Sequence, residues 1–279
     1  MIRFLRSGKV KDLYDVGNGR LLMVFTDRLS SHDVMLADQV PHKGEVLCRL
    51  SAYCFQRLEL NEVPTHLVEV PDPDLMLVQA SEIIPVEVVC RNYIYGSYWK
   101  RLQQGAVRLP EGAEPRLAAR LPTPIIEFTT KFEAKDRPID EEEILVNRWL
   151  STSELSWVKS TTEKVNRLLC GMAAKAGFLL ADFKLEYARR RDGSIVLADE
   201  VGTPDGCRFW EASQYQPGRL QDSFDKQVVR DYLERVLGWD KRQPEPGSRL
   251  KEPILPEEIV TKTSERYVQA FERLTGLSF

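Results

Sequence analysis

The chain has 279 residues, of which 43% are hydrophobic and 29% are charged, a composition typical of globular proteins. Its formal net charge of −3 argues against a nucleic-acid partner, because no basic excess is available to neutralise a phosphate backbone. The five cysteines are odd in number and lack the paired spacing of a zinc site, so we expect reduced thiols in a cytoplasmic protein. We expect neither a signal peptide nor a membrane-spanning segment.

The amino-terminal part of the chain is predicted to form antiparallel sheet. Strands are expected at residues 9–16 and 21–25, on either side of a glycine-rich turn. Lys9 and Lys11 would then lie about 7 Å apart on one strand face and could straddle a polyphosphate. Taken alone, alternate lysines more often mark the solvated side of an edge strand, and the spacing is not that of a P-loop.

A helix is predicted at residues 45–60 from the spacing of its apolar residues, followed by strands within residues 66–91. In the last of these strands, Glu87 and Arg91 share one face, and Gly96 and Ser97 follow at the start of a helix. Backbone N–H groups, a hydroxyl and a guanidinium together suit a phosphate monoester. The alternative is a helix cap formed by Ser97 and an ion pair between Arg91 and Glu87.

The middle and the end of the chain are predicted to be mainly helical, apart from one hairpin. Residues 105–124 are expected to form a surface excursion, and the polar segment around Lys131 a solvated loop. Helices are predicted at residues 160–176, 223–237 and 257–274, with an extended proline-rich linker at 244–256.

The segment at residues 179–208, which begins with a hairpin, tells most about function. Asp182, Lys184 and Glu186 alternate with apolar residues, which predicts a strand with one polar face. If the following turn contains two residues, Glu186 lies opposite Asp199, and two carboxylates there would repel each other unless a cation lies between them.

A divalent ion that is bound by few carboxylates and completed by phosphate oxygens describes magnesium in a nucleotide site. The alternative is a solvated polar face whose charges are balanced by Lys184 and the nearby arginines. A three-residue turn would instead place Glu186 opposite Ala198 and Asp199 on the other face.

The order of elements predicts an α+β fold in two lobes, because strands come first and helices mixed with a hairpin follow. We expect an amino-terminal antiparallel β lobe at residues 1–84, which would hold nucleotide phosphates. A larger α+β lobe at residues 85–279 would contain the substrate and metal site and the carboxy-terminal helices. The ATP cleft is expected between the two lobes.

Four segments, in this order, resemble the phosphoribosylaminoimidazole-succinocarboxamide synthases, the SAICAR synthetase family of purine biosynthesis. They are GKVKDLYDV, FTDRLSSHDV, IPVEVVCRNYIYGS, and ADFKLE followed by LADEVGTPDGCRFW. The resemblance implies a ligase that joins the carboxylate of carboxyaminoimidazole ribonucleotide to the amine of L-aspartate. It also implies a carboxyl-phosphate intermediate, with ATP and Mg²⁺ required and SAICAR, ADP and phosphate as products.

The same resemblance implies a role for individual residues. Catalytic roles fall to Lys184, Glu186 and Asp199, with Glu186 and Asp199 as magnesium ligands. ATP would be bound by Lys9, Lys11, Lys131 and Glu87. The substrates would be bound by Arg91, Ser97, Lys184, Asp205 and Arg208, with Asp33 and Asp136 as candidates near the aspartate.

The sequence departs from the family pattern at Tyr95, at Tyr187 and Ala188, and at Cys207, which replaces a serine. Two other functions stay open at this point. One is a different Mg-ATP-dependent ligase or phosphotransferase acting on a phosphorylated metabolite, and the other is a nucleotide-binding module without turnover. The expected partners are small-molecule substrates, with neither nucleic acid nor membrane, and a homo-oligomer is left open.

Overall fold

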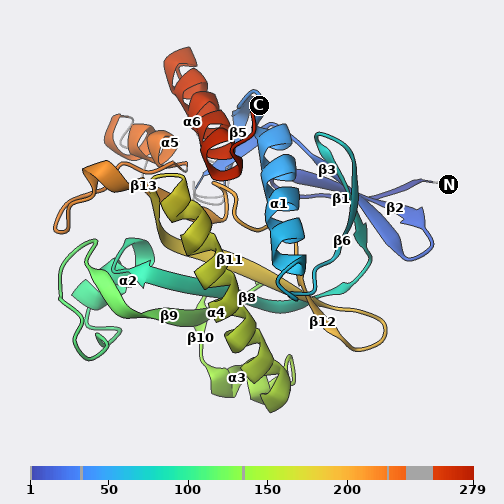
Figure 1. The fold of residues 1–279 in the computed structure, drawn as a ribbon, viewed down its shortest axis with the longest axis horizontal. Helices are drawn as coiled ribbons and strands as arrows, with labels where there is room; N and C mark the ends of the chain where they lie inside the picture. The colour runs from blue at the N-terminus through green and yellow to red at the C-terminus, as the bar shows by residue number, and fades with distance from the viewer. Residues whose placement is uncertain (1, 32–33, 134–135, 225, 237–253) are drawn as a thin grey trace, which may run out of the picture. The chain divides into compact units, whose positions relative to one another are not determined.

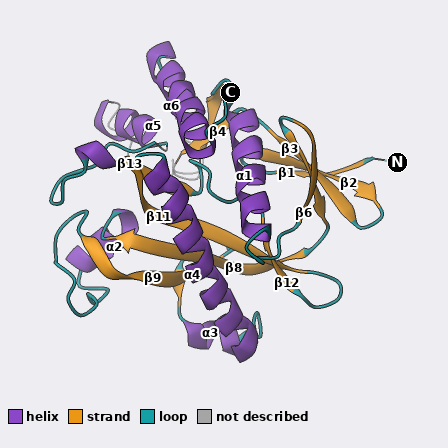
Figure 2. Ribbon diagram, in the orientation of Figure 1, coloured by secondary structure: helices purple, strands orange, loops and turns teal. Residues whose placement is uncertain are grey.

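The computed structural model describes residues 2–31, 34–133, 136–224, 226–236 and 254–279 (Figure 1). Within these ranges, every pairing between named strands is antiparallel, and helices complete the fold (Figure 2). The predicted α+β class is therefore confirmed. In the described part of the chain, no helix has both the length and the apolar character needed to cross a membrane.

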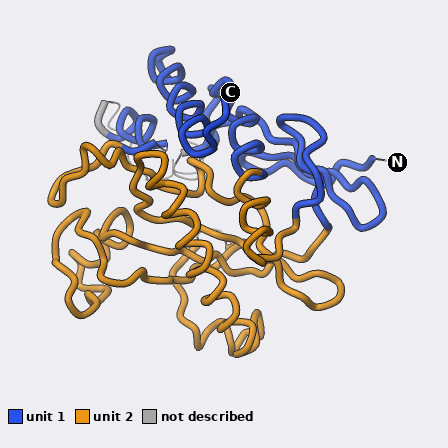
Figure 3. Tube along the Cα trace, viewed as in Figure 1, with its two compact units in different colours: residues 1–52, 67–79, 223–279 blue, residues 53–66, 80–222 orange. Residues whose placement is uncertain are grey.

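The chain divides into two compact units, unit 1 and unit 2 (Figure 3). Unit 1 comprises residues 1–52, 67–79 and 223–279, and unit 2 comprises residues 53–66 and 80–222. This division differs from the boundary expected after residue 84, because the carboxy-terminal segment belongs with the amino-terminal strands.

Unit 1 is built on a five-stranded sheet in the order β1-β2-β3-β7-β6. A separate two-stranded hairpin and the first part of helix α1 (Lys43–Glu59) follow the first three strands. The sheet strands are β1 (Arg3–Ser7), β2 (Lys11–Gly17), β3 (Arg20–Phe25), β6 (Leu67–Asp72) and β7 (Leu75–Gln79), and the hairpin strands are β4 (Arg28–Ser31) and β5 (Val34–Gln39).

The carboxy-terminal helices of unit 1 pack against this hairpin region. Leu29, Leu36 and Val40 form one buried cluster with Leu233 and Leu255. The backbone N–H of Leu255 donates to Asp38 at 2.8 Å, and the Ser264 hydroxyl donates to the carbonyl of Pro41 at 2.7 Å. Burial of these side chains explains why the end of the chain belongs to unit 1. The helices are α5 (Gln227–Asp231), the π-helix η2 (Tyr232–Val236) and α6 (Glu257–Thr275).

Unit 2 is built on a six-stranded sheet in the order β10-β9-β8-β11-β12, in which β13 also pairs with β11. Strand β11 pairs with β8 along one edge, whereas β13 and β12 share its other edge. The strands are β8 (Glu82–Tyr93), β9 (Arg120–Thr130), β10 (Pro138–Ile139), β11 (Phe178–Arg189), β12 (Ile195–Ala198) and β13 (Cys207–Glu211). The helices are α2 (Gly96–Gln103), α3 (Glu141–Val146), α4 (Thr152–Lys175) and the 3-10 helix η1 (Ala212–Gln214).

Helix α4 covers the apolar face of the unit 2 sheet, where it contacts β8, β9 and β11 (Figure 1). Tyr187 of β11 is buried against it, with its hydroxyl 2.8 Å from that of Thr162 and its ring packed edge-on against Trp157. Because side chains alternate along a strand, the polar residues of β11 point to the opposite face. That face carries the candidate site.

The β11–β12 turn contains three residues, and this corrects the two-residue turn on which one prediction depended. The N–H of Arg190 donates to the carbonyl of Ser194 at 2.8 Å, and Gly193 has a φ of +86°. A three-residue loop that ends on a left-handed glycine is a common hairpin connection. Glu186 therefore lies opposite Ala198, and the predicted cross-strand pairing of Glu186 with Asp199 is wrong.

Other predicted elements differ at their ends. Helix α4 begins at Thr152, earlier than the predicted residue 160, because Ser151 and Glu154 form a capping box. The expected excursion at 105–124 is shorter, since β9 already begins at Arg120. The helix expected at 223–237 consists of the short α5 and the π-helix η2. Most of the predicted linker at 244–256 lies outside the described residues.

Candidate functional site

Two groups of polar residues lie on the face of the unit 2 sheet opposite α4, at different positions along β8 and β11. Arg91 pairs with Asp182 near one end, and Glu87 pairs with Glu186 further along. Lys184 lies on the row between them. Because four residues of a strand span about 13 Å, the face holds two separate polar clusters.

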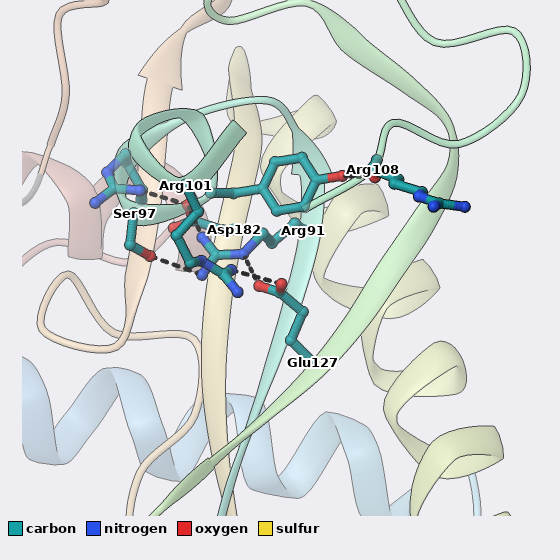
Figure 4. A network of polar contacts seen from close by, with 8 residues as sticks. Arg91, Ser97, Arg101, Arg108, Glu127 and Asp182 are labelled. Carbon is teal, nitrogen blue, oxygen red and sulfur yellow. Dashed lines mark hydrogen bonds and ion pairs between the residues drawn. The ribbon is translucent and has the colours of Figure 1, made fainter. Parts of the chain in front are cut away.

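The first group is the guanidinium cluster, which contains Arg91, Arg101, Ser97, Glu127 and Asp182 (Figure 4) and also Arg208. Arg91 is only 7% exposed. It donates from Nε to Glu127 at 2.5 Å and from Nη2 to Ser97 at 3.0 Å, while its Nη1 lies 3.5 Å from Asp182. Arg208 donates to the same carboxylate of Asp182. Three guanidinium groups against two carboxylates leave a net positive charge, which suits an anionic ligand.

The start of helix α2 contributes the hydroxyl of this cluster. The helix begins at Gly96, as predicted, but the N-cap is Tyr95, so the alternative of a Ser97 cap is not realised. The exposed Ser97 accepts the Arg91 bond, which leaves its own proton to be donated to a ligand. Arg208 lies over the Tyr95 ring, 5.2 Å from its centroid, and so the tyrosine that departs from the family pattern supports an arginine of the cluster.

The second group is the lysine–carboxylate cluster, formed by Lys131, Lys184, Glu87, Glu186 and Asp199. Lys184 donates to Glu87 at 2.7 Å. Lys131 donates to Glu186 at 2.6 Å and to Glu87 at 3.3 Å. The two facing carboxylates are therefore Glu87 and Glu186, and two ammonium groups offset their repulsion.

Asp199 belongs to this cluster electrostatically, although it does not pair with Glu186. It directly follows β12 and has a φ of +62°, which turns the chain away from the strand direction. The pKa of Glu186 is raised, mainly by burial and secondly by the negative charge of Asp199. The two lysines act in the opposite direction but do not cancel this rise. Burial disfavours the charged form of Lys184, but Glu87 and Glu186 outweigh it and raise the pKa of this ammonium.

The remaining predicted site residues belong to other segments of the chain than the strands that carry these two clusters. Lys9 is exposed in a bend, whereas Lys11 is the buried first residue of β2, so the two lysines do not share a strand face. Asp136 is exposed before β10, and Asp205 lies in a turn between β12 and β13. Asp33 lies outside the described residues.

Sequence reasoning assigned no role to three members of the guanidinium cluster, which are Asp182, Glu127 and Arg101. Asp182 lies on the predicted polar face of β11, and this was a signal that could have identified it. Glu127 lies on β9 opposite Val89, and Arg101 lies on α2. Their meeting depends on the pairing of β8 with β9, for which no local sequence signal exists.

Unit 1 contains a cavity of about 430 Å³ near the start of α1. Asp27, Glu45, Asp72 and Asp74 are among its lining residues, and none of the predicted site residues lines it. Four carboxylates disfavour the binding of a phosphate group there. The cavity is therefore not a candidate for the nucleotide phosphates.

Comparison with known proteins identifies the relatives of this chain. The SAICAR synthetase family model matches residues 4–246. The chain belongs to the SAICAR synthetase family. The phosphoribosylaminoimidazole-succinocarboxamide synthase of Nitrosopumilus maritimus (strain SCM1) is 39% identical over 280 residues, covering 99% of this chain and 100% of the relative. The synthase of Corynebacterium diphtheriae is 37% identical, and the match covers 98% of this chain and 93% of the relative.

Solved structures of SAICAR synthetases share the fold. The SAICAR synthase of Saccharomyces cerevisiae in complex with SAICAR has a TM-score of 0.84 and 31% identity, covering 100% of this chain and 96% of that chain. A type-2 SAICAR synthetase in complex with ADP has a TM-score of 0.75 and 30% identity, and the match covers 100% of this chain and 99% of that chain. The family predicted from the four motifs is confirmed, and with it the class of enzyme, an ATP-dependent carbon–nitrogen ligase.

Proposed function

We propose that this chain joins the carboxylate of carboxyaminoimidazole ribonucleotide to the amine of L-aspartate with ATP, giving SAICAR, ADP and phosphate. The observation that carries the proposal is the presence of two charged clusters about 13 Å apart on one sheet face. Carboxyaminoimidazole ribonucleotide is charged at both ends, with its phosphate at one and its carboxylate at the other. Bound along β8 and β11, it would place its phosphate in the guanidinium cluster and its carboxylate toward the lysine–carboxylate cluster.

The substrate roles follow from the chemistry of these side chains. Arg91, Arg208 and Ser97 would bind the phosphate, because guanidinium groups and a hydroxyl donate to its oxygens. Lys184, on the row between the clusters, would hold the substrate carboxylate. Asp205 would lie in the same substrate pocket, and Asp33 and Asp136 are the proposed contacts of the aspartate amine.

The nucleotide roles are proposed for cationic side chains and one carboxylate. Lys9, Lys11 and Lys131 are the side chains proposed to bind ATP phosphates. Glu87 would belong to the ATP site through Lys131, to which it is already bonded. Exchange of carboxylate partners for phosphate oxygens keeps each ammonium paired when the nucleotide binds.

Glu186 and Asp199 are the proposed ligands of magnesium. Among the described residues, no group of three or more His, Cys, Asp and Glu side chains is arranged to hold a metal ion. Two carboxylates that repel each other still fit Mg²⁺, since this ion is usually held by one or two carboxylates, by water and by substrate phosphates. When bound, the ion would neutralise charge on the transferring phosphoryl group.

The chain's own residues would mainly position the reactants. In the first step, a carboxylate oxygen of the ribonucleotide forms a bond to the γ-phosphorus, while the bond to the β–γ bridging oxygen breaks and ADP leaves. In the second step, the neutral amine of aspartate attacks the acyl carbon, phosphate leaves and the amine loses a proton. Fixed cations at the reacting ends stabilise the charge that develops in both steps, so neither step needs a catalytic histidine.

Substrate dependence tests the proposal. ADP release, followed by a coupled assay, should require both carboxyaminoimidazole ribonucleotide and L-aspartate. Turnover that does not depend on aspartate would instead support a different ATP-dependent ligase or phosphotransferase. ATP binding without ADP release under any acceptor would support a nucleotide-binding module.

The cellular compartment is proposed from the cysteines. All five are free thiols in the structure, and four of them are buried. Burial raises the pKa of Cys54 to about 12, which keeps this thiol protonated and unreactive. Thiols of this kind support a reducing compartment, and we propose the cytoplasm.

A further inference from the structure

Glu127 joins two arginines of the guanidinium cluster through its two carboxylate oxygens. Its Oε2 accepts from Nε of Arg91 at 2.5 Å, and its Oε1 accepts from Nη2 of Arg101 at 2.5 Å (Figure 4). The strand register explains how it reaches them, because Glu127 of β9 lies diagonally across from Arg91 of β8 on the same sheet face.

We infer that Glu127 is a positioning residue, which fixes the Arg91 guanidinium for the phosphate of the ribonucleotide, and that Arg101 acts through Glu127. This inference rests on the proposed function, since it assigns the supporting residues of the same phosphate site.

The geometry of Arg91 shows why an anchor at Nε matters. A bond at Nε fixes the plane of the guanidinium, so that its two terminal nitrogens keep one direction. In this direction Nη2 reaches the Ser97 hydroxyl at 3.0 Å and Nη1 lies 3.5 Å from Asp182. A ligand phosphate then meets an arginine and a hydroxyl that are already aligned, and less rotamer freedom is lost on binding.

Arg101 offsets the charge that Glu127 brings into the cluster. A carboxylate close to a phosphate site repels the ligand, and the guanidinium of Arg101 lies on its second oxygen. Its side chain is 22% exposed, against 8% for that of Arg91. Arg91 also contacts Ser97 and Asp182, so ligand binding is assigned to Arg91 and charge compensation to Arg101.

The first experiment compares Glu127→Gln with Glu143→Gln. Glutamine keeps an amide oxygen for one arginine but presents an N–H to the other, so the bridge is lost. Glu143 of helix α3 is the matched control, because both of its carboxylate oxygens also accept hydrogen bonds from an arginine. Arg137 donates these two bonds, at 2.5 and 3.0 Å. We expect Glu127→Gln to raise KM for the ribonucleotide about tenfold, the cost of one charge-assisted hydrogen bond, with kcat and the KM values of ATP and aspartate unchanged.

A lowered KM for the ribonucleotide in Glu127→Gln would show that the Glu127 carboxylate mainly repels the ligand phosphate, and would overturn the inference. An unchanged KM, or an equal rise in Glu143→Gln, would overturn it as well. If the wild-type protein released no ADP from ATP in the presence of both the ribonucleotide and aspartate, the proposed function would fail instead. The two failures are therefore distinguishable.

The second experiment tests whether Arg101 acts through Glu127. Arg101→Gln alone should raise KM for the ribonucleotide several-fold, because Glu127 is left without its second counter-ion. In the Glu127→Gln background, the same substitution should add no further rise. Additive effects of the two substitutions would show that Arg101 contacts the phosphate directly, and would contradict the role inferred for it.

Discussion

At the scale of single residues, Glu186 occupies the most demanding position in the site. It is 6% exposed, it faces Glu87 across the strand pair, and its pKa is raised by burial and by Asp199. If it holds magnesium, Glu186→Gln should lower kcat by about 100-fold or more, as should Asp199→Asn.

The melting temperature separates this loss from misfolding. We expect each variant to unfold in one cooperative transition, recorded by circular dichroism, because Glu87 still offers a carboxylate to both lysines in Glu186→Gln. Activity near the wild-type level in both variants at saturating Mg²⁺ would refute their assignment as ligands.

The residues of the site differ in how well the sequence could predict them. Arg91, Ser97 and Lys184 can be proposed from the sequence because charged and hydroxyl side chains interrupt apolar strands or begin a helix. Asp199 was placed in the wrong pairing, because one extra turn residue moves every partner by one position. Glu127 could not be assigned, since its role depends on a neighbouring strand that is distant in sequence.

At the scale of elements, the capping box of α4 is coupled to the end of β11. Glu154 accepts from the N–H of Ser151 at 2.7 Å and also accepts from Arg189. The hydrogen bond from Arg189 is the main cause that lowers the pKa of Glu154 from 4.5 to about 2. A depressed carboxyl pKa stabilises the fold above the unfolded value of 4.5, and this contribution is lost as pH falls toward 2.

Glu154→Gln should therefore lower the free energy of unfolding at pH 7 by about 1–2 kcal/mol, a range reduced for solvent screening of this partly exposed pair. The difference between variant and wild type, measured by urea denaturation, should shrink as pH falls from 4.5 toward 2. A difference that stays constant over this interval would contradict the coupling.

The two ends of helix α2 offer a matched pair of glycines. Gly96 has a φ of +57° and Gly105 a φ of +70°, and both angles are strained for other residues. A Cβ on Gly96 would lie 3.1 Å from Nη1 of Arg208, whereas a Cβ on Gly105 would meet no atom within 4 Å.

We expect both Gly96→Ala and Gly105→Ala to lose about 1 kcal/mol of stability, measured by denaturant unfolding. Only Gly96→Ala should raise KM for the ribonucleotide, because it alone displaces Arg208 from the guanidinium cluster. Equal KM values in the two variants would argue against a role of Arg208 in binding the substrate.

At the scale of the whole molecule, local patterns predicted the elements better than their assembly. Alternation and helical spacing identified β11 and most of α1, α4 and α6, because each of these buries one continuous stripe or face. The membership of the carboxy-terminal helices in unit 1 could not be predicted, since Leu233 and Leu255 meet Leu36 only through contacts that span most of the chain.

This assembly can be tested by a cavity in each unit. Leu233 of η2 is fully buried in unit 1, and Leu169 of α4 is 2% exposed in unit 2. Leu233→Ala should cost about 2–5 kcal/mol, and so should Leu169→Ala. Because Leu233 packs with the β4–β5 region, its loss should speed hydrogen exchange in residues 34–52 together with 254–279, whereas Leu169→Ala should mainly affect residues 80–222. Loss of protection confined to residues 254–279 in Leu233→Ala would show that the carboxy-terminal helices form a separate folding unit.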